Sequence, residues 1–384
     1  MIRILSALLV FFISTTVFAQ TEPAPVPAPS PTPVATPEPT PAPIVEAPAQ
    51  LSEPVPGLAI PSVKPSFALD VLAALPTENA VPAQERFRFR TLDIGARIDF
   101  DERSHAVIDV GGRDSNGTMT FRLREGYVQA AVDSWSVLAG SFFLGFGLLN
   151  RIPSTDWPFT SAPLSQSEFF SEERAYDSGA ELTWRANDRV AVALGVTNGY
   201  WYGTAPITGG DKPLTPTHYA RPSLVVPVGD GRIEFAFDYL SRVDVTGERM
   251  RLGGFEAAFT RGPVTDPTWT TWLEVNHRYN LPSGLPLEEK LGGYLFNQAK
   301  IDRSWSAGVR LDALTITSLT NTSGQNRANL QAAVVPVATY RLTPATELKT
   351  SYTYLRETRD GDSTRGEQRI EFVFTARSSG RPSP

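Results

Sequence analysis

Residues 92–101 read Leu-Asp-Ile-Gly-Ala-Arg-Ile-Asp-Phe-Asp. Apolar side chains at every second position alternate with polar residues or glycine, so an extended chain here has one apolar face and one polar face. The same period of two recurs in residues 233–239, 305–313 and 369–374. No window after residue 66 keeps the 3.6-residue apolar period of an amphipathic helix. The pattern predicts an all-β protein made of many short strands.

Counting such runs predicts about sixteen strands, within the range of twelve to eighteen that suits a barrel of this length. The run at 217–228 is the weakest, because Pro222 and Pro227 each remove a donor from the strand ladder. Phe87 and Phe89 are out of phase with the apolar residues that start at Leu92, which predicts a β-bulge near Arg90.

The connections between these runs are of two kinds. Short, turn-forming segments such as 114–117, 187–188 and 229–231 contrast with long segments at 150–176, 202–215, 280–289 and 318–327. Rough alternation of short and long connections is typical of outer-membrane barrels, which have tight periplasmic turns and extended outer loops.

A soluble β-sandwich is the alternative, because it shows the same alternation. Aromatic residues at or near strand ends favour the membrane barrel, since such barrels carry aromatic girdles at both interfaces; they are Trp135, Trp184, Tyr200, Trp201, Tyr239, Trp269, Tyr279 and Tyr354. A closed sheet also satisfies every backbone amide in lipid. The expected fold is a transmembrane, antiparallel, up-and-down β-barrel over residues 66–384.

The chain before the barrel has two parts. Residues 1–19, with Arg3, an apolar run and Val17-Phe18-Ala19 before Gln20, predict a secretory signal peptide. Residues 20–65 are rich in Pro-Ala, Pro-Thr and Pro-Glu steps, which predict a disordered, extended periplasmic spacer. This spacer is either a tether to peptidoglycan or a periplasmic partner, or a passive linker.

Composition narrows the function. Arg3 is the one charged residue of the signal, so the mature chain has 34 basic and 41 acidic residues, a net charge of −7. That balance argues against nucleic acid as a partner. The chain has no Cys, so it forms no disulfide and no thiolate metal site.

The segment from Leu138 to Trp184 resembles a known family. Gly140-Ser141-Phe142-Phe143, Asp156-Trp157-Pro158-Phe159 and Asp177-Ser178-Gly179-Ala180-Glu181 are similar to segments of Gram-negative outer-membrane porins, in particular phosphate-selective porins and zinc-regulated outer-membrane receptor-like barrels. The resemblance implies a porin-like channel in the outer membrane, and a homo-oligomer. Family members often carry histidines before the Trp-Pro-Phe step, whereas this chain has Ile152-Pro153-Ser154-Thr155. No metal site and no cofactor are therefore expected.

In a porin the loop at 150–176 is the candidate to fold inward and narrow the pore, and charges at a constriction set ion preference. The candidate constriction residues are Arg151, Asp156, Glu168, Glu172, Glu173 and Arg174. The alternative to a constriction is an exposed outer loop whose charges are solvated. By alternation, the candidate lumen residues are Arg88, Arg97, Arg122, Arg124, Arg310 and Asp312.

Catalysis has little support, because the three histidines, His105, His218 and His277, lie in separate strands and no hydrolase or phosphate-loop motif is present. We expect no enzyme and no catalytic residue. The expected function is passive diffusion of small polar or charged solutes through an outer-membrane pore. The alternative is a structural outer-membrane anchor whose spacer engages the cell wall or a periplasmic partner.

Overall fold

The computed structural model describes residues 61–76, 87–115, 118–172, 174–199, 216–243, 249–263, 266–281, 288–319, 326–359 and 365–378. The expected signal peptide and nearly all of the expected spacer lie outside these residues, as does Glu173. Residues 62–65, which we expected to be spacer, form the start of the first strand.

The described residues form sixteen strands in one closed antiparallel barrel, as predicted. Each strand pairs with its neighbour in sequence, and β1 pairs with β16 to close the sheet. The strands are β1 (Ser62–Pro76), β2 (Phe87–Asp99), β3 (Ser104–Ser115), β4 (Thr118–Val132), β5 (Trp135–Phe143), β6 (Tyr176–Arg185), β7 (Val190–Thr197), β8 (Thr217–Val228), β9 (Gly231–Val243), β10 (Arg249–Arg261), β11 (Trp269–Leu281), β12 (Glu288–Lys300), β13 (Trp305–Leu319), β14 (Asn326–Thr343), β15 (Thr346–Arg359) and β16 (Arg365–Arg377).

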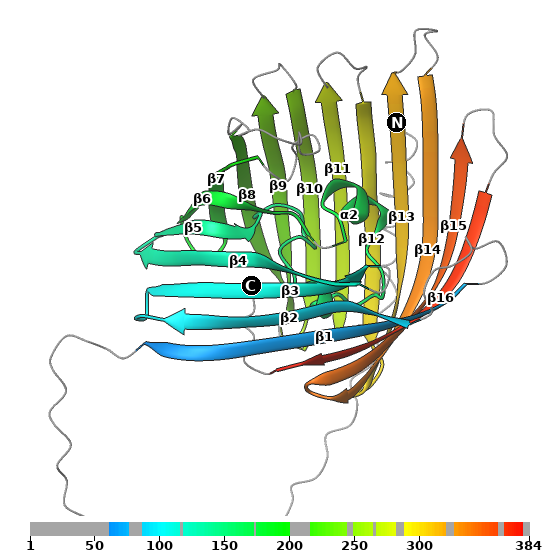
Figure 1. Ribbon diagram of the computed structural model, residues 1–384, viewed down its shortest axis with the longest axis horizontal. Coiled ribbons are helices and arrows are strands. Elements are labelled where there is room, and N and C mark those ends of the chain that lie inside the picture. Colours follow the sequence, from blue (N-terminus) through cyan, green and yellow to red (C-terminus); the bar gives the residue numbers. More distant parts are fainter. Residues whose placement is uncertain are drawn as a thin grey trace, which may run out of the picture. The chain divides into compact units, whose positions relative to one another are not determined.

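The strands are strongly tilted, so that β1–β5 cross the opposite wall formed by β9–β14 (Figure 1). Turns such as 133–134, 229–230 and 344–345 lie at one end of the barrel, which we call the short-turn end. The connections at 77–86, 144–175 and 198–216 belong to the opposite, long-loop end. In outer-membrane barrels these two ends face the periplasm and the exterior respectively.

The bulge expected near Arg90 is confirmed. Asp70 pairs with Thr91 and Val71 with Phe89, so Arg90 is the extra residue of β2. A second bulge occurs at Arg124, because Asp109 pairs with Glu125 and Val110 with Leu123. Both bulges insert an arginine that binds an aspartate, Asp70 for Arg90 and Asp93 for Arg124.

The run at 217–228, the weakest prediction, forms β8. Its register with β9 passes from Ala220–Tyr239 to Ser223–Ala236 with no pairing recorded at Pro222. The proline interrupts the ladder locally, because it has no amide hydrogen to donate. Pairing on both sides of it keeps the strand in the sheet.

The outer face of the barrel is apolar and carries aromatic pairs at its edge. Trp135 and Trp184 lie side by side on β5 and β6, with ring centres 6.1 Å apart, and Trp305 lies 4.7 Å from Tyr340 on β13 and β14. All four residues are near the short-turn end, whereas Tyr239, Tyr279 and Tyr354 are near the long-loop end. This arrangement of an apolar wall between aromatic belts is that of a transmembrane barrel. No helix within the described ranges is long and apolar enough to span a bilayer.

Candidate functional site

The connection between β5 and β6, residues 144–175, folds into the barrel; we call it the inward loop. It contains a short 3-10 turn, η1 (Ser154–Asp156), and a short helix, α2 (Leu164–Phe169). Asn150 holds the two ends of the loop together. Its Nδ2 donates to the carbonyl oxygens of Leu144 (2.8 Å) and Ala175 (3.0 Å), and its Oδ1 accepts from the amide of Ala175.

Apolar contacts fix the inward loop against one wall. Trp157 and Phe159 are fully buried against β12 and β14, in a cluster with Tyr294, Phe296 and Val335. The Phe159 and Phe296 rings are 5.3 Å apart and nearly perpendicular. Helix α2 contacts β11, β12 and β13 (Figure 1). The loop therefore fills the side of the lumen next to these strands rather than projecting outward.

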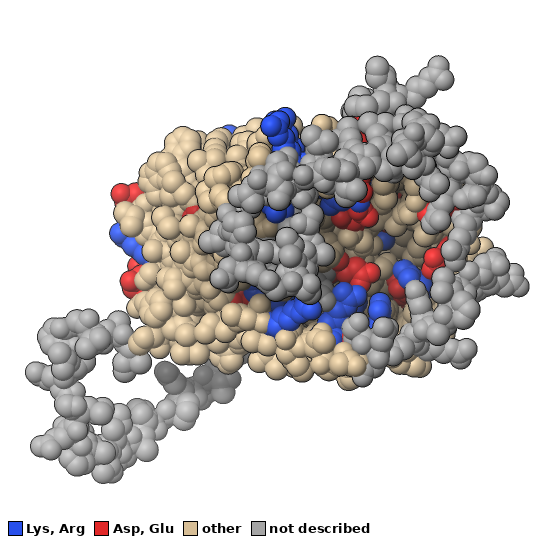
Figure 2. All heavy atoms as spheres, turned by 45° about the horizontal axis from the view of Figure 1, so that its top comes forward, with Lys and Arg blue, Asp and Glu red and all other residues tan. Residues whose placement is uncertain are grey.

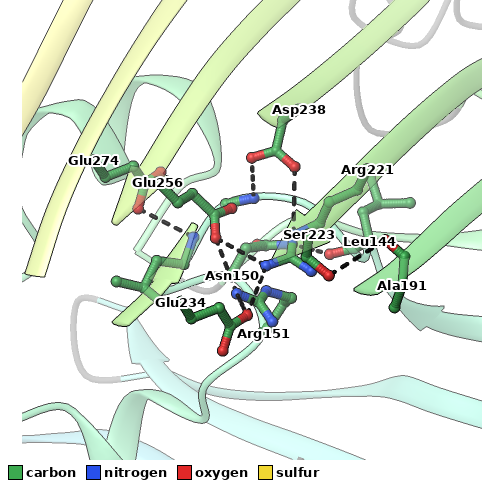
Figure 3. Close-up of polar contacts among 12 residues, drawn as sticks. Leu144, Asn150, Arg151, Ala191, Arg221, Ser223, Glu234, Asp238, Glu256 and Glu274 are labelled. Atoms are coloured by element: carbon green, nitrogen blue, oxygen red, sulfur yellow. Dashed lines mark hydrogen bonds and ion pairs between the residues drawn. The ribbon is translucent and has the colours of Figure 1, made fainter. Parts of the chain in front are cut away.

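A group of charged residues on β8–β11 binds the first turn of the inward loop (Figure 3). Asp238 accepts a hydrogen bond from the amide of Gly147 and Glu274 one from the amide of Leu148, both at 3.1 Å. Gly147 has φ +79°, and an added Cβ would lie 2.9 Å from the Phe170 ring, so glycine is required here.

Glu256 joins this group to the loop by ion pairs. Its carboxylate lies 2.9 Å from Arg151 of the loop and 3.1 Å from Arg221 of β8. Arg221 also approaches Glu234, at 3.1 Å (Figure 3). Because Arg151 and Arg221 lie against Glu234 and Glu256, part of the negative charge of the group is compensated. The arrangement positions the loop.

The other side of the inward loop contacts the strands where the barrel closes. Arg90 of β2 donates to the carbonyl oxygens of Ser154 and Thr160, and Lys349 of β15 donates to that of Thr155 at 2.8 Å. The Thr160 hydroxyl contacts Ser351 of β15 and donates to Glu371 of β16 at 2.8 Å. The loop thus bridges β15, β16 and β2.

A hollow of about 910 Å³ lies in the lumen against β1–β9 and extends to the turn at residues 187–189 at the short-turn end. Its lining includes five carboxylates, Asp109, Glu125, Glu181, Asp188 and Glu234, and seven arginines, Arg97, Arg151, Arg174, Arg185, Arg189, Arg221 and Arg232. At the long-loop end, charges of both signs gather in the mouth (Figure 2). Such a wall suits water and polar solutes.

The described candidate constriction residues all lie in the inward loop, but they bind different walls. Arg151 pairs with Glu256, Asp156 with Arg377 of β16 at 2.6 Å, and Glu172 with Arg113 of β3 at 2.6 Å. Glu168 pairs with Arg278 of β11 at 3.3 Å and also binds Lys290 of β12. Arg174 is buried with its guanidinium 3.3 Å from the centre of the Phe143 ring. Their role as a constriction stays a prediction.

The candidate lumen residues lie in different surroundings within the barrel. Arg97 lines the hollow, and Arg88 lies beside the loop near Glu371. Arg124 is buried with Asp93 and Asp109, and Arg310 and Asp312 pair at 2.9 Å beneath the loop. Arg310 also donates to the carbonyl of Ser161. Arg122 is exposed near the long-loop end of β4.

Glu256 and Lys349, which bind the loop, and Arg221, which pairs with Glu256, were not among the sequence candidates. Each occupies an inward position of its strand. Alternation therefore predicts the face of the sheet on which a residue lies, but not whether the residue contacts the inward loop or its partners. A stronger indication of loop packing is the loss of alternation in Tyr294-Leu295-Phe296 and in Ala332–Val335. A strand that is apolar on both faces is covered on both.

The histidines form no catalytic group in the described part of the chain. His105 lines the hollow beside Tyr127, whereas His277 lies on the outer face 2.7 Å from Glu289. No cluster of three or more His, Cys, Asp or Glu residues suited to a metal ion occurs among the described residues.

Comparison with solved structures identifies the architecture. OmpT of Vibrio cholerae in its trimer form superposes with a TM-score of 0.57 at 9% identity, covering 83% of this chain and 99% of that chain. The outer-membrane channel DcaP of Acinetobacter baumannii superposes with a TM-score of 0.56 at 12% identity, covering 83% of this chain and 97% of that chain. An anion-selective porin from Comamonas acidovorans superposes with a TM-score of 0.56 at 10% identity, covering 83% of this chain and 100% of that chain.

The chain has the porin fold. No protein-family model matches its sequence, and no curated protein matches it. The expected porin-like outer-membrane barrel is confirmed, and identities this low establish the fold alone. The narrower resemblance to phosphate-selective and zinc-regulated members stays a prediction.

Proposed function

We propose that this porin-fold protein is a channel for passive diffusion of small polar or charged solutes across the outer membrane of a Gram-negative bacterium. The observation that carries the proposal is the position of the inward loop. It packs against β12 and β14 through apolar contacts and against β15, β16 and β2 through polar contacts, and it leaves a charged hollow of about 910 Å³ against β1–β9. A loop of this kind narrows a wide barrel without filling it.

The mixed lining supports general polar diffusion rather than tight capture of one solute. Arginines and carboxylates share the hollow, and Glu234 pairs there with both Arg151 and Arg221. Charges that compensate in pairs set a weak preference at most. The likeness to the trimeric form of Vibrio cholerae OmpT supports a homo-oligomer, which we propose for this chain as well.

The test is single-channel conductance of the purified, heat-modifiable protein in planar bilayers, with the full chain and with residues 20–61 deleted. Stepwise conductance of equal size from both forms supports the channel and separates it from the spacer. A folded but silent barrel overturns the channel and favours the structural anchor, whose proline-rich spacer would then be tested for binding to purified peptidoglycan.

A further inference from the structure

A groove of about 430 Å³ lies on the outer wall of the barrel, at the long-loop ends of β9, β10 and β11. These are the upper ends of the three strands in Figure 1. Its lining includes Tyr239, Arg249, Arg251, Gly253, His277 and Tyr279. It faces lipid, not the lumen, because the inward positions of these strands carry the loop-binding residues Asp238, Glu256 and Glu274.

The strand register arranges the groove in three tiers. Arg251 lies between Ser241 and Tyr279 in the tier closest to the exterior. Gly253 lies between Tyr239 and His277 one step deeper in the membrane. Below it, Phe255 lies between Phe237 and Val275, with the Phe237 and Phe255 rings 5.1 Å apart.

Gly253 creates the space in the middle tier. A Cβ built at this position meets no atom within 4 Å, and the residue has no positive φ. Neither close packing nor backbone geometry therefore requires glycine. The missing side chain leaves a slot between Tyr239 and His277 that opens onto the apolar tier below.

The charge of the upper tier is positive. Arg249 and Arg251 are exposed, and neither forms an ion pair with another residue in the described ranges. His277 binds Glu289 and leaves the two guanidinium groups as the free charges of the groove. Guanidinium groups match phosphate oxygens in a planar, two-bond geometry. Tyrosines at this height mark the interface of the bilayer.

We propose that this groove binds a phosphorylated glycolipid of the outer leaflet. Its phosphate lies on Arg249 and Arg251, and one acyl chain enters the slot at Gly253 and rests on Phe237 and Phe255. An anionic headgroup above an acyl chain has the same order, from exterior to membrane core, as the tiers of the groove. The site is independent of the channel, since it lies on the opposite face of the sheet.

The test is native mass spectrometry of the full, folded chain titrated with diphosphoryl lipid A, with dephosphorylated lipid A as the comparison ligand. We expect a saturable complex with the first and about tenfold weaker binding of the second, because two arginines contribute to phosphate recognition. The double variant Arg249→Gln/Arg251→Gln should lose this preference. Arg356→Gln, which removes an exposed arginine from the outer face of β15, is the matched control and should keep it.

Gly253→Leu tests the slot while both arginines remain. Because the position is open, the variant should fold, and heat-modifiable migration on gels checks this. We expect it to bind diphosphoryl lipid A more weakly than the parent protein. Equal binding of both lipids by the parent protein, or unchanged binding by the double variant, would overturn the proposal. It would also be overturned if the double variant lost a protomer–protomer complex while its lipid binding stayed the same.

Discussion

Asn150 shows how one side chain determines the position of a long segment. Its amide group binds the backbone of both ends of the inward loop, at Leu144 and Ala175, and is fully buried. A buried backbone carbonyl that loses its donor costs more than the hydrogen bond itself contributed.

Replacing Asn150 with Ala should therefore destabilise the loop by about 1–3 kcal/mol and leave the barrel closed. We expect single-channel recordings with more frequent conductance transitions and an unchanged gel shift on heating. Asn329→Ala is the control, because Asn329 binds Glu357 within the barrel wall at 2.8 Å, away from the loop. Equally noisy recordings from both variants would contradict the assignment.

Three short turns use an Asp or Asn side chain in the same way. The Oδ1 atoms of Asp101, Asn187 and Asp302 each accept hydrogen bonds from the amides two and three residues later. These turns lie outside the membrane-spanning strands. The amides of Ser304 and Trp305 hold the pKa of Asp302 below its ordinary value, and Ser104 and Arg103 do the same for the pKa of Asp101.

A lowered pKa in the folded state means that these carboxylates stabilise the turns fully above the unfolded pKa, about 3.9. That contribution is lost as pH falls through the lower, folded value. Asp302→Asn should make the urea midpoint of the folded barrel less dependent on pH below about 4, since an amide oxygen accepts at any pH. Asn187→Asp should increase that dependence; identical pH profiles for all forms would rule out the explanation.

At the scale of elements, the inward loop is held by the wall and not by its own secondary structure. Its helix is six residues long, too short to be stable alone. Fixation comes instead from Trp157 and Phe159 in their apolar cluster and from contacts such as that of Thr160 with Ser351.

The absence of Cys makes this attachment easy to test by crosslinking. Thr160→Cys/Ser351→Cys should form a disulfide under mild oxidation, because the two hydroxyl groups are in direct contact. We expect the oxidised and reduced forms to have equal conductance, since the bond joins groups that already touch. Failure to crosslink in the folded barrel would contradict the loop position, and each single Cys variant is the control.

The sheet itself was predictable from sequence, whereas the packing inside it was only partly so. Strict alternation around residues 92–100 specified strands and faces, and the phase change at Phe89 and Leu92 located a bulge. The second bulge, at Arg124, shows the same kind of phase change, from Phe121 and Leu123 to Val128 and Val132, and was missed. The wall that receives the loop is marked locally only by the loss of alternation in residues 294–296 and 332–335. Which residues of the loop pack there depends on long-range contacts of residues 157–159, which no local pattern encodes.

At the scale of the whole molecule, the lumen is asymmetric. One apolar cluster packs the loop against β12 and β14 and a second packs it against β8–β10 and β13, whereas the hollow lined by arginines and carboxylates lies against β1–β9. In the proposed channel, a permeating ion would therefore pass along the charged wall, where the local field sets its preference.

Arg97 tests this field, because it lines the hollow and is partly exposed. Arg97→Gln should shift the reversal potential in a salt gradient toward cations, with less than about a twofold change in permeability ratio because neighbouring charges screen it. Arg261→Gln, at an exposed turn where Arg261 pairs with Asp230, should leave the reversal potential unchanged. A cation shift of equal size in both would mean that surface charge, not the lumen, sets selectivity.

The inward loop bridges β15, β16 and β2 across the seam of the barrel. Its partners Ser351, Glu371 and Arg90 come from opposite ends of the barrel sequence and meet where the first and last strands join. Opening the sheet between β1 and β16 therefore requires breaking the contacts of the loop as well as the ladder between these two strands. The inward loop is thus an internal brace that holds the two margins of the sheet together.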